Sequence, residues 1–124
     1  MKALPRALAI GALILGVLAT LAISRQACGG RDWPSCWDLW AVGPYVAHLA
    51  LCAAVRRRAG AAWVAAVGAL VTVAFGVGVL VDGFFVHLGA QSAILFVFVP
   101  LWQWAGFGLF ALISTIAARR SKRP

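Results

Sequence analysis

Four long apolar runs divide the chain, over residues 7–24, 39–55, 61–81 and 93–118, and none of them contains a charged residue. About 20 apolar residues in a helix cross the hydrocarbon core of a bilayer. The runs also lack the period-two alternation of half-buried strands. Because a chain this short has to satisfy its backbone hydrogen bonds in lipid within helices, the pattern predicts an all-α polytopic membrane protein. We expect residues 1–124 to form a single domain, an antiparallel bundle of four transmembrane helices.

The composition leads to the same class of protein. Apolar residues make up 64% of the chain and charged residues only 11%, whereas soluble domains carry about 25% charged residues. A soluble fold of 124 residues would not bury so much apolar surface. Four spans with short connections therefore leave no room for a separate soluble domain.

The basic residues predict how the chain is threaded. Nine of the eleven Lys and Arg residues lie in the first, third and fifth segments outside the apolar runs. Because cytoplasmic segments are enriched in Lys and Arg, we expect both termini in the cytoplasm, in a cytoplasmic (inner) membrane. The residues concerned are Lys2, Arg6, Arg56, Arg57, Arg58, Arg119, Arg120, Lys122 and Arg123.

The net charge of +8 indicates a lipid partner rather than nucleic acid. The cations flank apolar runs and do not form a patch interleaved with aromatic residues. Near a membrane surface each of them attracts anionic headgroups by about 1 kcal/mol. We therefore expect contact with anionic lipid on the cytoplasmic side and no binding of nucleic acid.

The first run has a second interpretation, as a cleaved secretory signal, because Lys2 and Arg6 precede it. The run is longer than the apolar core of a signal peptide, and no clear Ala-x-Ala site follows it. We therefore expect it to be a retained transmembrane helix.

Two of the three cysteines, Cys28 and Cys36, lie in the segment between the first two runs, and Cys52 lies within the second run. An oxidising compartment would allow Cys28 and Cys36 to pair. Closing so short a loop would stabilise the protein by about 2.5 kcal/mol, so we predict a structural disulfide. The alternative is a redox-active dithiol, but the spacing is not the Cys-x-x-Cys of such sites.

Polar residues within the runs are few, and the candidates for a buried polar or ligand site are His48, Cys52, Thr72 and Gln103. Pro44, His48 and Cys52 follow each other at intervals of four and share one helix face. The simpler interpretation is an inter-helix hydrogen-bond network that fixes packing. The alternative is a site for a ligand or ion. A direct bond between His48 and Gln103 is one candidate pairing.

Small residues recur at intervals of four on two of the runs. Such stripes allow helix backbones to approach closely, and we expect them to face the interior. They are Ala12, Gly16, Thr20 and Ser24 on the first run, and Gly68, Thr72 and Gly76 on the third.

The segment from Asp82 to Ser92 mixes polar and apolar residues, and we predict a short interfacial or partly re-entrant connection. Asp82, His87 and Gln91 are its outer-surface polar candidates. A metal site there would need a further strong ligand, and the depths of His48 and His87 differ too much for one haem iron. We expect no metal and no other cofactor.

The sequence contains no Glu, and Asp38 and Asp82 lie just outside the apolar runs. An intramembrane carboxylate of the kind that proton-coupled transporters use is therefore not expected, and no catalytic motif indicates an enzyme. We interpret the protein as an accessory, assembly or regulatory subunit, bound to another membrane protein or to its own copies. The alternatives are a small oligomeric transporter or channel and a membrane thiol-redox protein using Cys28 and Cys36.

Overall fold

The computed structural model describes residues 3–27, 36–55, 57–86 and 92–120. Four helices in this part of the chain are long and apolar enough to cross a membrane. The prediction of an all-helical, multi-pass membrane protein is therefore confirmed. The elements are α1 (Leu4–Ala27), α2 (Cys36–Val55), α3 (Ala59–Val81), the π-helix η1 (Asp82–Val86) and α4 (Ser92–Arg120).

Each helix extends beyond its apolar run, and the largest difference follows α3. Asp82 continues the helical backbone, with its N–H directed at the carbonyl oxygens of both Gly78 and Val79. The next residues then form the π-helical turn η1. The predicted connection therefore begins with a helical segment, because Asp82–Val86 continue α3 and pair their backbone groups within a helix. Residues 87–91 lie outside the described part of the chain.

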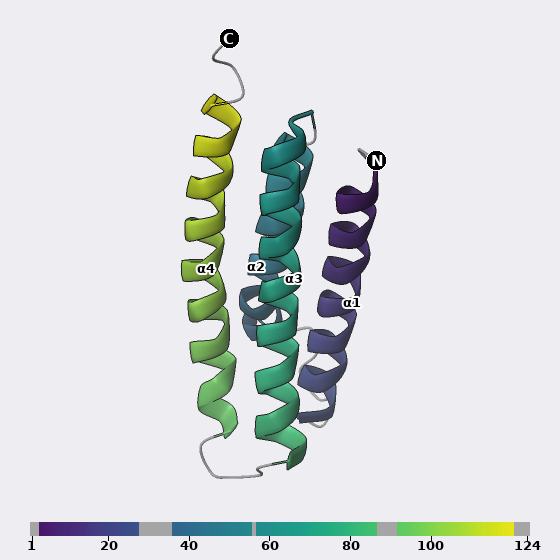
Figure 1. Cartoon of the computed structure of the whole chain (residues 1–124). Coiled ribbons are helices and arrows are strands. Elements are labelled where there is room, and N and C mark those ends of the chain that lie inside the picture. Colours follow the sequence, from purple (N-terminus) through teal and green to yellow (C-terminus); the bar gives the residue numbers. More distant parts are fainter. Residues whose placement is uncertain (1–2, 28–35, 56, 87–91, 121–124) are drawn as a thin grey trace.

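Helices α2 and α3 form the middle of the bundle. Helix α3 packs against α1, α2 and α4, and α2 also packs against α1 and α4. Helices α1 and α4 lie on opposite sides of this central pair (Figure 1). The start of α1 and the end of α4 lie at one end of the bundle, which we call the terminal end, whereas η1 and the start of α4 lie at the other end (Figure 1).

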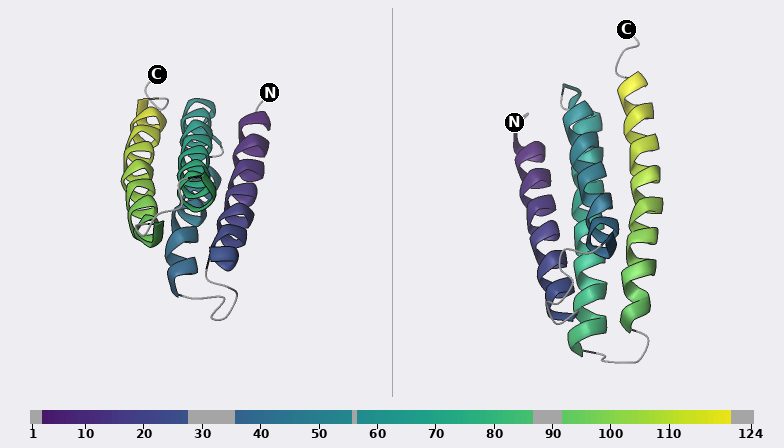
Figure 2. Two further views of the ribbon diagram at one scale, coloured as in Figure 1. Left: turned by 90° about the horizontal axis from the view of Figure 1, so that it is seen from below. Right: turned by 180° about the vertical axis from the view of Figure 1, so that it is seen from behind.

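Two of the helices contain an internal proline. The first turns of α2 tilt away from the axis of its remainder (Figure 2), and we attribute this bend to Pro44, because proline removes a helical hydrogen bond and clashes with the preceding turn. Helix α4 continues through Pro100. Both prolines are fully buried, so they lie against neighbouring helices that can compensate for the lost bonds.

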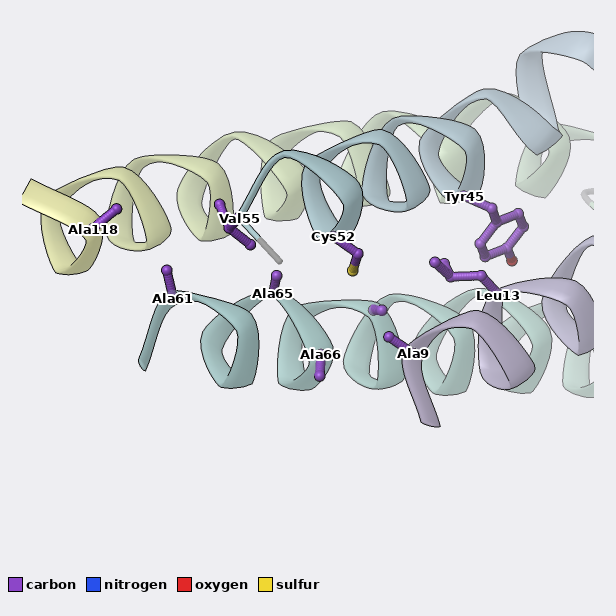
Figure 3. Close-up of a cluster of buried hydrophobic side chains, with 10 residues drawn as sticks. Ala9, Leu13, Tyr45, Cys52, Val55, Ala61, Ala65, Ala66 and Ala118 are labelled. Carbon is purple, nitrogen blue, oxygen red and sulfur yellow. The ribbon is translucent and has the colours of Figure 1, made fainter. Parts of the chain in front are cut away.

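The inward orientation of the two small-residue stripes is confirmed for all members except Ala12, which is half-buried. Alanine also dominates the apolar core at the terminal end of the bundle, where Ala61 of α3 faces Ala118 of α4 (Figure 3). Such small side chains allow the helix axes to lie close together. The buried cluster consists of Ala9, Leu13, Tyr45, Cys52, Val55, Ala61, Ala65, Ala66, Ala69 and Ala118.

Candidate functional site

The hydroxyl of Tyr45 lies at the centre of a polar network inside the bundle. Tyr45 is 1% exposed and points from α2 towards the inner faces of the other helices. Its oxygen accepts a hydrogen bond from Thr20 Oγ1 of α1 at 3.2 Å and another from Gln103 Nε2 of α4 at 2.9 Å. One side chain therefore links three helices.

Gln103 extends the network to α3. Its Nε2 also donates to the main-chain oxygen of Thr72 at 3.1 Å, so both amide protons have partners. Gly76, one turn further along α3, leaves the space that the amide occupies, because a Cβ at this position would collide with Gln103 Nε2 and lie 2.6 Å from the Tyr45 hydroxyl. The glycine of the predicted stripe thus makes room for the polar contact.

His48 is completely buried, and its hydrogen bonds define its tautomer. Nδ1 lies 3.0 Å from the main-chain oxygen of Pro44, which can only accept, so Nδ1 carries the proton. Nε2 then accepts from the Thr72 hydroxyl at 3.4 Å. The rings of Phe107 and Phe110 on α4 enclose the imidazole, the first edge-on at a centroid distance of 5.1 Å. Both ring nitrogens of His48 are therefore paired.

Thr72 is therefore the residue that connects the two halves of the network. Its hydroxyl bonds His48 and its carbonyl bonds Gln103. The candidate hydrogen bond between His48 and Gln103 is wrong, since both bond Thr72 instead. Cys52, the fourth buried candidate, lies with its thiol free in the apolar cluster, between Tyr45 and Val55 along α2 (Figure 3).

A second polar contact joins α1 and α2 near the end opposite the termini. Ser24 Oγ donates to Asp38 Oδ1, and both residues are almost fully buried. Helix α2 begins at Cys36, so Asp38 lies in its first turn, where the helix dipole favours a negative charge. The expectation that no Asp lies within a span is therefore wrong for Asp38 and for Asp82, because the candidate spans extend beyond the apolar runs.

Two buried polar atoms have no hydrogen-bond partner among the described residues, Trp104 Nε1 and Ser114 Oγ. Both lie on α4. Trp104 packs on Gly43 of α2, where a Cβ would lie 3.0 Å from the indole ring. Ser114 is completely enclosed. Neither residue lines the hollow beside Gln103 or the one beside Trp63, and we do not assign a ligand to them.

The remaining candidates lie largely outside the described residues. His87, Gln91 and Cys28 belong to undescribed segments, and the side chain of Cys36 is not described, so the disulfide stays a prediction. Asp82 is exposed at the end of α3. Within the described ranges no three His, Cys, Asp or Glu residues lie together in a way that would hold a metal ion.

A hollow of about 170 Å³ lies beside the network, between α3 and α4. Thr72 and Gln103 contribute to its floor, and its rim is formed by exposed apolar residues such as Phe75 and Trp102. It opens to the side of the bundle, towards the region that lipid would occupy. The polar side chains of the network bond one another or the main chain, which gives it the chemistry of a packing device.

The sequence did not predict two parts of this site, the role of Tyr45 and the hydrogen bond between Ser24 and Asp38. A single Tyr in an apolar run looks like an ordinary core residue. Its spacing of three from His48 was the available signal, because residues three apart share a helix face. The sequence contained less indication that Asp38 is buried, since its position in the bundle depends on the residue at which α2 begins.

Comparisons with known protein families, curated proteins and solved structures gave no significant match to this chain.

Proposed function

We propose that the protein is an accessory, assembly or regulatory subunit of a complex in a cytoplasmic membrane. The observation that carries this proposal is the use of the buried polar groups. Five of the rare polar side chains within the spans bond one another or the backbone across the four helices. They are occupied in holding the helices together, which leaves the outer surface as the place for function.

The outer face of α4 is the surface that we propose for the partner. In the spanning part of α4 only 17% of the residues are buried, the smallest share of the four helices. One face of α4 carries exposed residues at alternating intervals of four and three, which is the spacing of a helix–helix seam. These residues are Leu101, Ala105, Gly108, Leu112 and Thr115. A Cβ at Gly108 would meet nothing within 4 Å, so this position does not need glycine for packing within the bundle.

We propose an antiparallel bundle with the termini in the cytoplasm. The basic turn before α3 and the basic end of α4 lie with the termini at one end of the bundle, whereas Asp38 and Asp82 belong to the opposite end. The positive-inside rule then assigns the terminal end to the cytoplasm. Reporter fusions at each terminus test this orientation, and a periplasmic signal from either terminus contradicts it.

The decisive experiment is the composition of the complex extracted from its native membrane. A terminal tag, mild detergent and mass spectrometry would identify a stoichiometric partner. We expect Gly108→Ile to release this partner and Gly11→Ile to retain it, since Gly11 is a matched glycine on the exposed face of α1 with nothing within 4 Å of its Cβ position. A lone monomer from the native membrane would refute the accessory function.

A small oligomeric transporter or channel is the second candidate, favoured by the hollow that Thr72 and Gln103 reach. A homo-oligomer without foreign subunits would support it. In that case we expect flux through reconstituted vesicles that His48→Ala and Gln103→Leu reduce, while both variants keep the oligomer.

A further inference from the structure

A second hollow lies next to the one at Gln103 and continues it along the same side of the bundle. It has a volume of about 340 Å³ and is lined by Trp63, Val64 and Val67 of α3 and by Phe110 and Ile113 of α4. Phe110 also lines the hollow at Gln103. The two hollows therefore adjoin at Phe110 between α3 and α4, and we call the pair of them the α3–α4 groove.

The length of the α3–α4 groove matches one leaflet of a bilayer. It extends from Trp63 to Phe75 along α3, which corresponds to about 18 Å at 1.5 Å per residue. Half of the hydrocarbon core measures about 15 Å. The lining is apolar over most of this length, and Trp63 and Val67 are about half exposed. A single acyl chain of the leaflet at the terminal end has the right length and chemistry to fill it.

Near the terminal end of the bundle, each of the two helices that line the groove has an exposed arginine in it or next to it. Arg57 is exposed in the turn before α3, and Arg120 is exposed at the end of α4, seven residues beyond Ile113 and on the same helix face. Ala61 and Ala118 face each other across the two helices (Figure 3), which places these arginines at a similar level. The two acidic residues that the structure describes, Asp38 and Asp82, belong to the opposite end.

We propose that the α3–α4 groove binds one anionic phospholipid, with an acyl chain between Trp63 and Phe75 and the phosphate at Arg57 and Arg120. Basic pockets between transmembrane helices bind anionic headgroups. The groove provides the apolar part of such a site and the two arginines provide the charge. The site lies on the flank of α4 that faces α3, apart from the outer face at Gly108, so it does not depend on the proposed partner.

Native mass spectrometry of the full chain in detergent tests the proposal, with phosphatidylglycerol and phosphatidylcholine of identical acyl chains as probes. We expect one phosphatidylglycerol to bind at least tenfold more tightly than phosphatidylcholine. Each surface arginine contributes a factor of about five. Arg57→Gln with Arg120→Gln should therefore remove most of this preference, while Arg6→Gln with Arg119→Gln, which changes the charge equally at the same end, should keep it.

A second pair of variants tests the groove itself. Val67→Trp should fill the larger hollow and weaken both lipids at least fivefold, whereas Leu70→Trp, on the same helix but outside the hollow, should not. Unchanged helix content and monodispersity of the variants would show that they fold. Equal affinity for the two lipids, or an equal loss in the Arg6 and Arg119 control, would overturn the proposal. So would a dimer that Val67→Trp disrupts and phosphatidylglycerol does not displace, which would assign the groove to a second copy.

Discussion

The two ends of the bundle are held together in different ways. Towards the end opposite the termini, hydrogen bonds that Thr20, Thr72 and Gln103 make to Tyr45, to His48 and to the main chain connect the helices. Towards the terminal end, α3 presents buried alanines such as Ala61 and Ala65 to its neighbours (Figure 3). The first region is specified by the chemistry of its side chains, and the second by their small volume.

This difference follows from the solvent. Lipid tails are as apolar as the helix surfaces, so burial of apolar groups does not drive helices together in a membrane. Close packing and inter-helix hydrogen bonds remain, and the protein uses each of them at a different level. Stability in the terminal region should therefore respond to added volume, and stability in the polar region to both added volume and lost hydrogen bonds.

Gly76 is closely packed and lies beside the hydrogen-bond network, so we expect substitution there to lower the free energy of unfolding the most. In Gly76→Leu the side chain would displace the amide of Gln103 and press on the Tyr45 hydroxyl. Overpacking costs about 1–3 kcal/mol, and each lost inter-helix hydrogen bond costs about 0.6 kcal/mol more. The free energy of unfolding, measured by steric trapping in bicelles, should fall by about 3 kcal/mol.

Gly78→Leu is the matched control for this prediction. Gly78 is two residues further along the same helix, is exposed, and has nothing within 4 Å of its Cβ position. We expect it to be neutral or stabilising, because glycine is a poor helix former. Equal destabilisation by the two variants would contradict the close packing of the network around Gly76.

In the alanine-rich region we expect Ala65→Leu to cost about 2 kcal/mol by overpacking. Ala65 is completely buried in the core cluster. Ala74, on the exposed side of α3, is the control, and Ala74→Leu should change the free energy of unfolding by less than about 0.5 kcal/mol. If Ala65→Leu were tolerated as well, the helices in this region would not be held at the close distance that alanine permits.

The sequence was sufficient to predict the membrane-spanning helices and the inward face of the stripes. Their signals are strong, because lipid excludes charge over whole runs and small residues recur with the helical period. Gly76 is an example, since its inward position was predicted from spacing alone and the structure confirms it.

The pairing of the polar residues was not predictable in the same way. His48 and Gln103 were both identified as buried candidates, but their partners depend on the relative depth and rotation of the helices. A shift of one residue moves a side chain by about 1.5 Å along a helix and by about 100° around it. Thr72 bonds His48 through its hydroxyl and Gln103 through its main-chain oxygen. The bond between Gln103 and Tyr45 could be recognised only from the structure.

Removal of individual hydrogen bonds should have a smaller effect than added volume. Tyr45→Phe keeps the ring and removes the oxygen that accepts bonds from Thr20 and Gln103, and we expect a loss of about 1 kcal/mol. A double-mutant cycle with Gln103→Leu should give a coupling energy of about 0.6 kcal/mol. A coupling energy indistinguishable from zero would mean that the two groups do not interact in the membrane.

Effects of opposite sign should come from two buried serines. Ser114 Oγ has no partner among the described residues, and burying an unpaired hydroxyl is unfavourable. Ser114→Ala should therefore stabilise the protein by about 0.5 kcal/mol. Ser24 Oγ donates to the buried carboxylate of Asp38, so Ser24→Ala should destabilise by about 1 kcal/mol. Both substitutions remove one oxygen from a buried helix position. If the changes in the free energy of unfolding, measured by steric trapping, differ in sign, the difference is due to the hydrogen-bond partner that Ser24 has and Ser114 lacks among the described residues. If both variants were equally destabilised, a partner of Ser114 would have to lie outside the described residues.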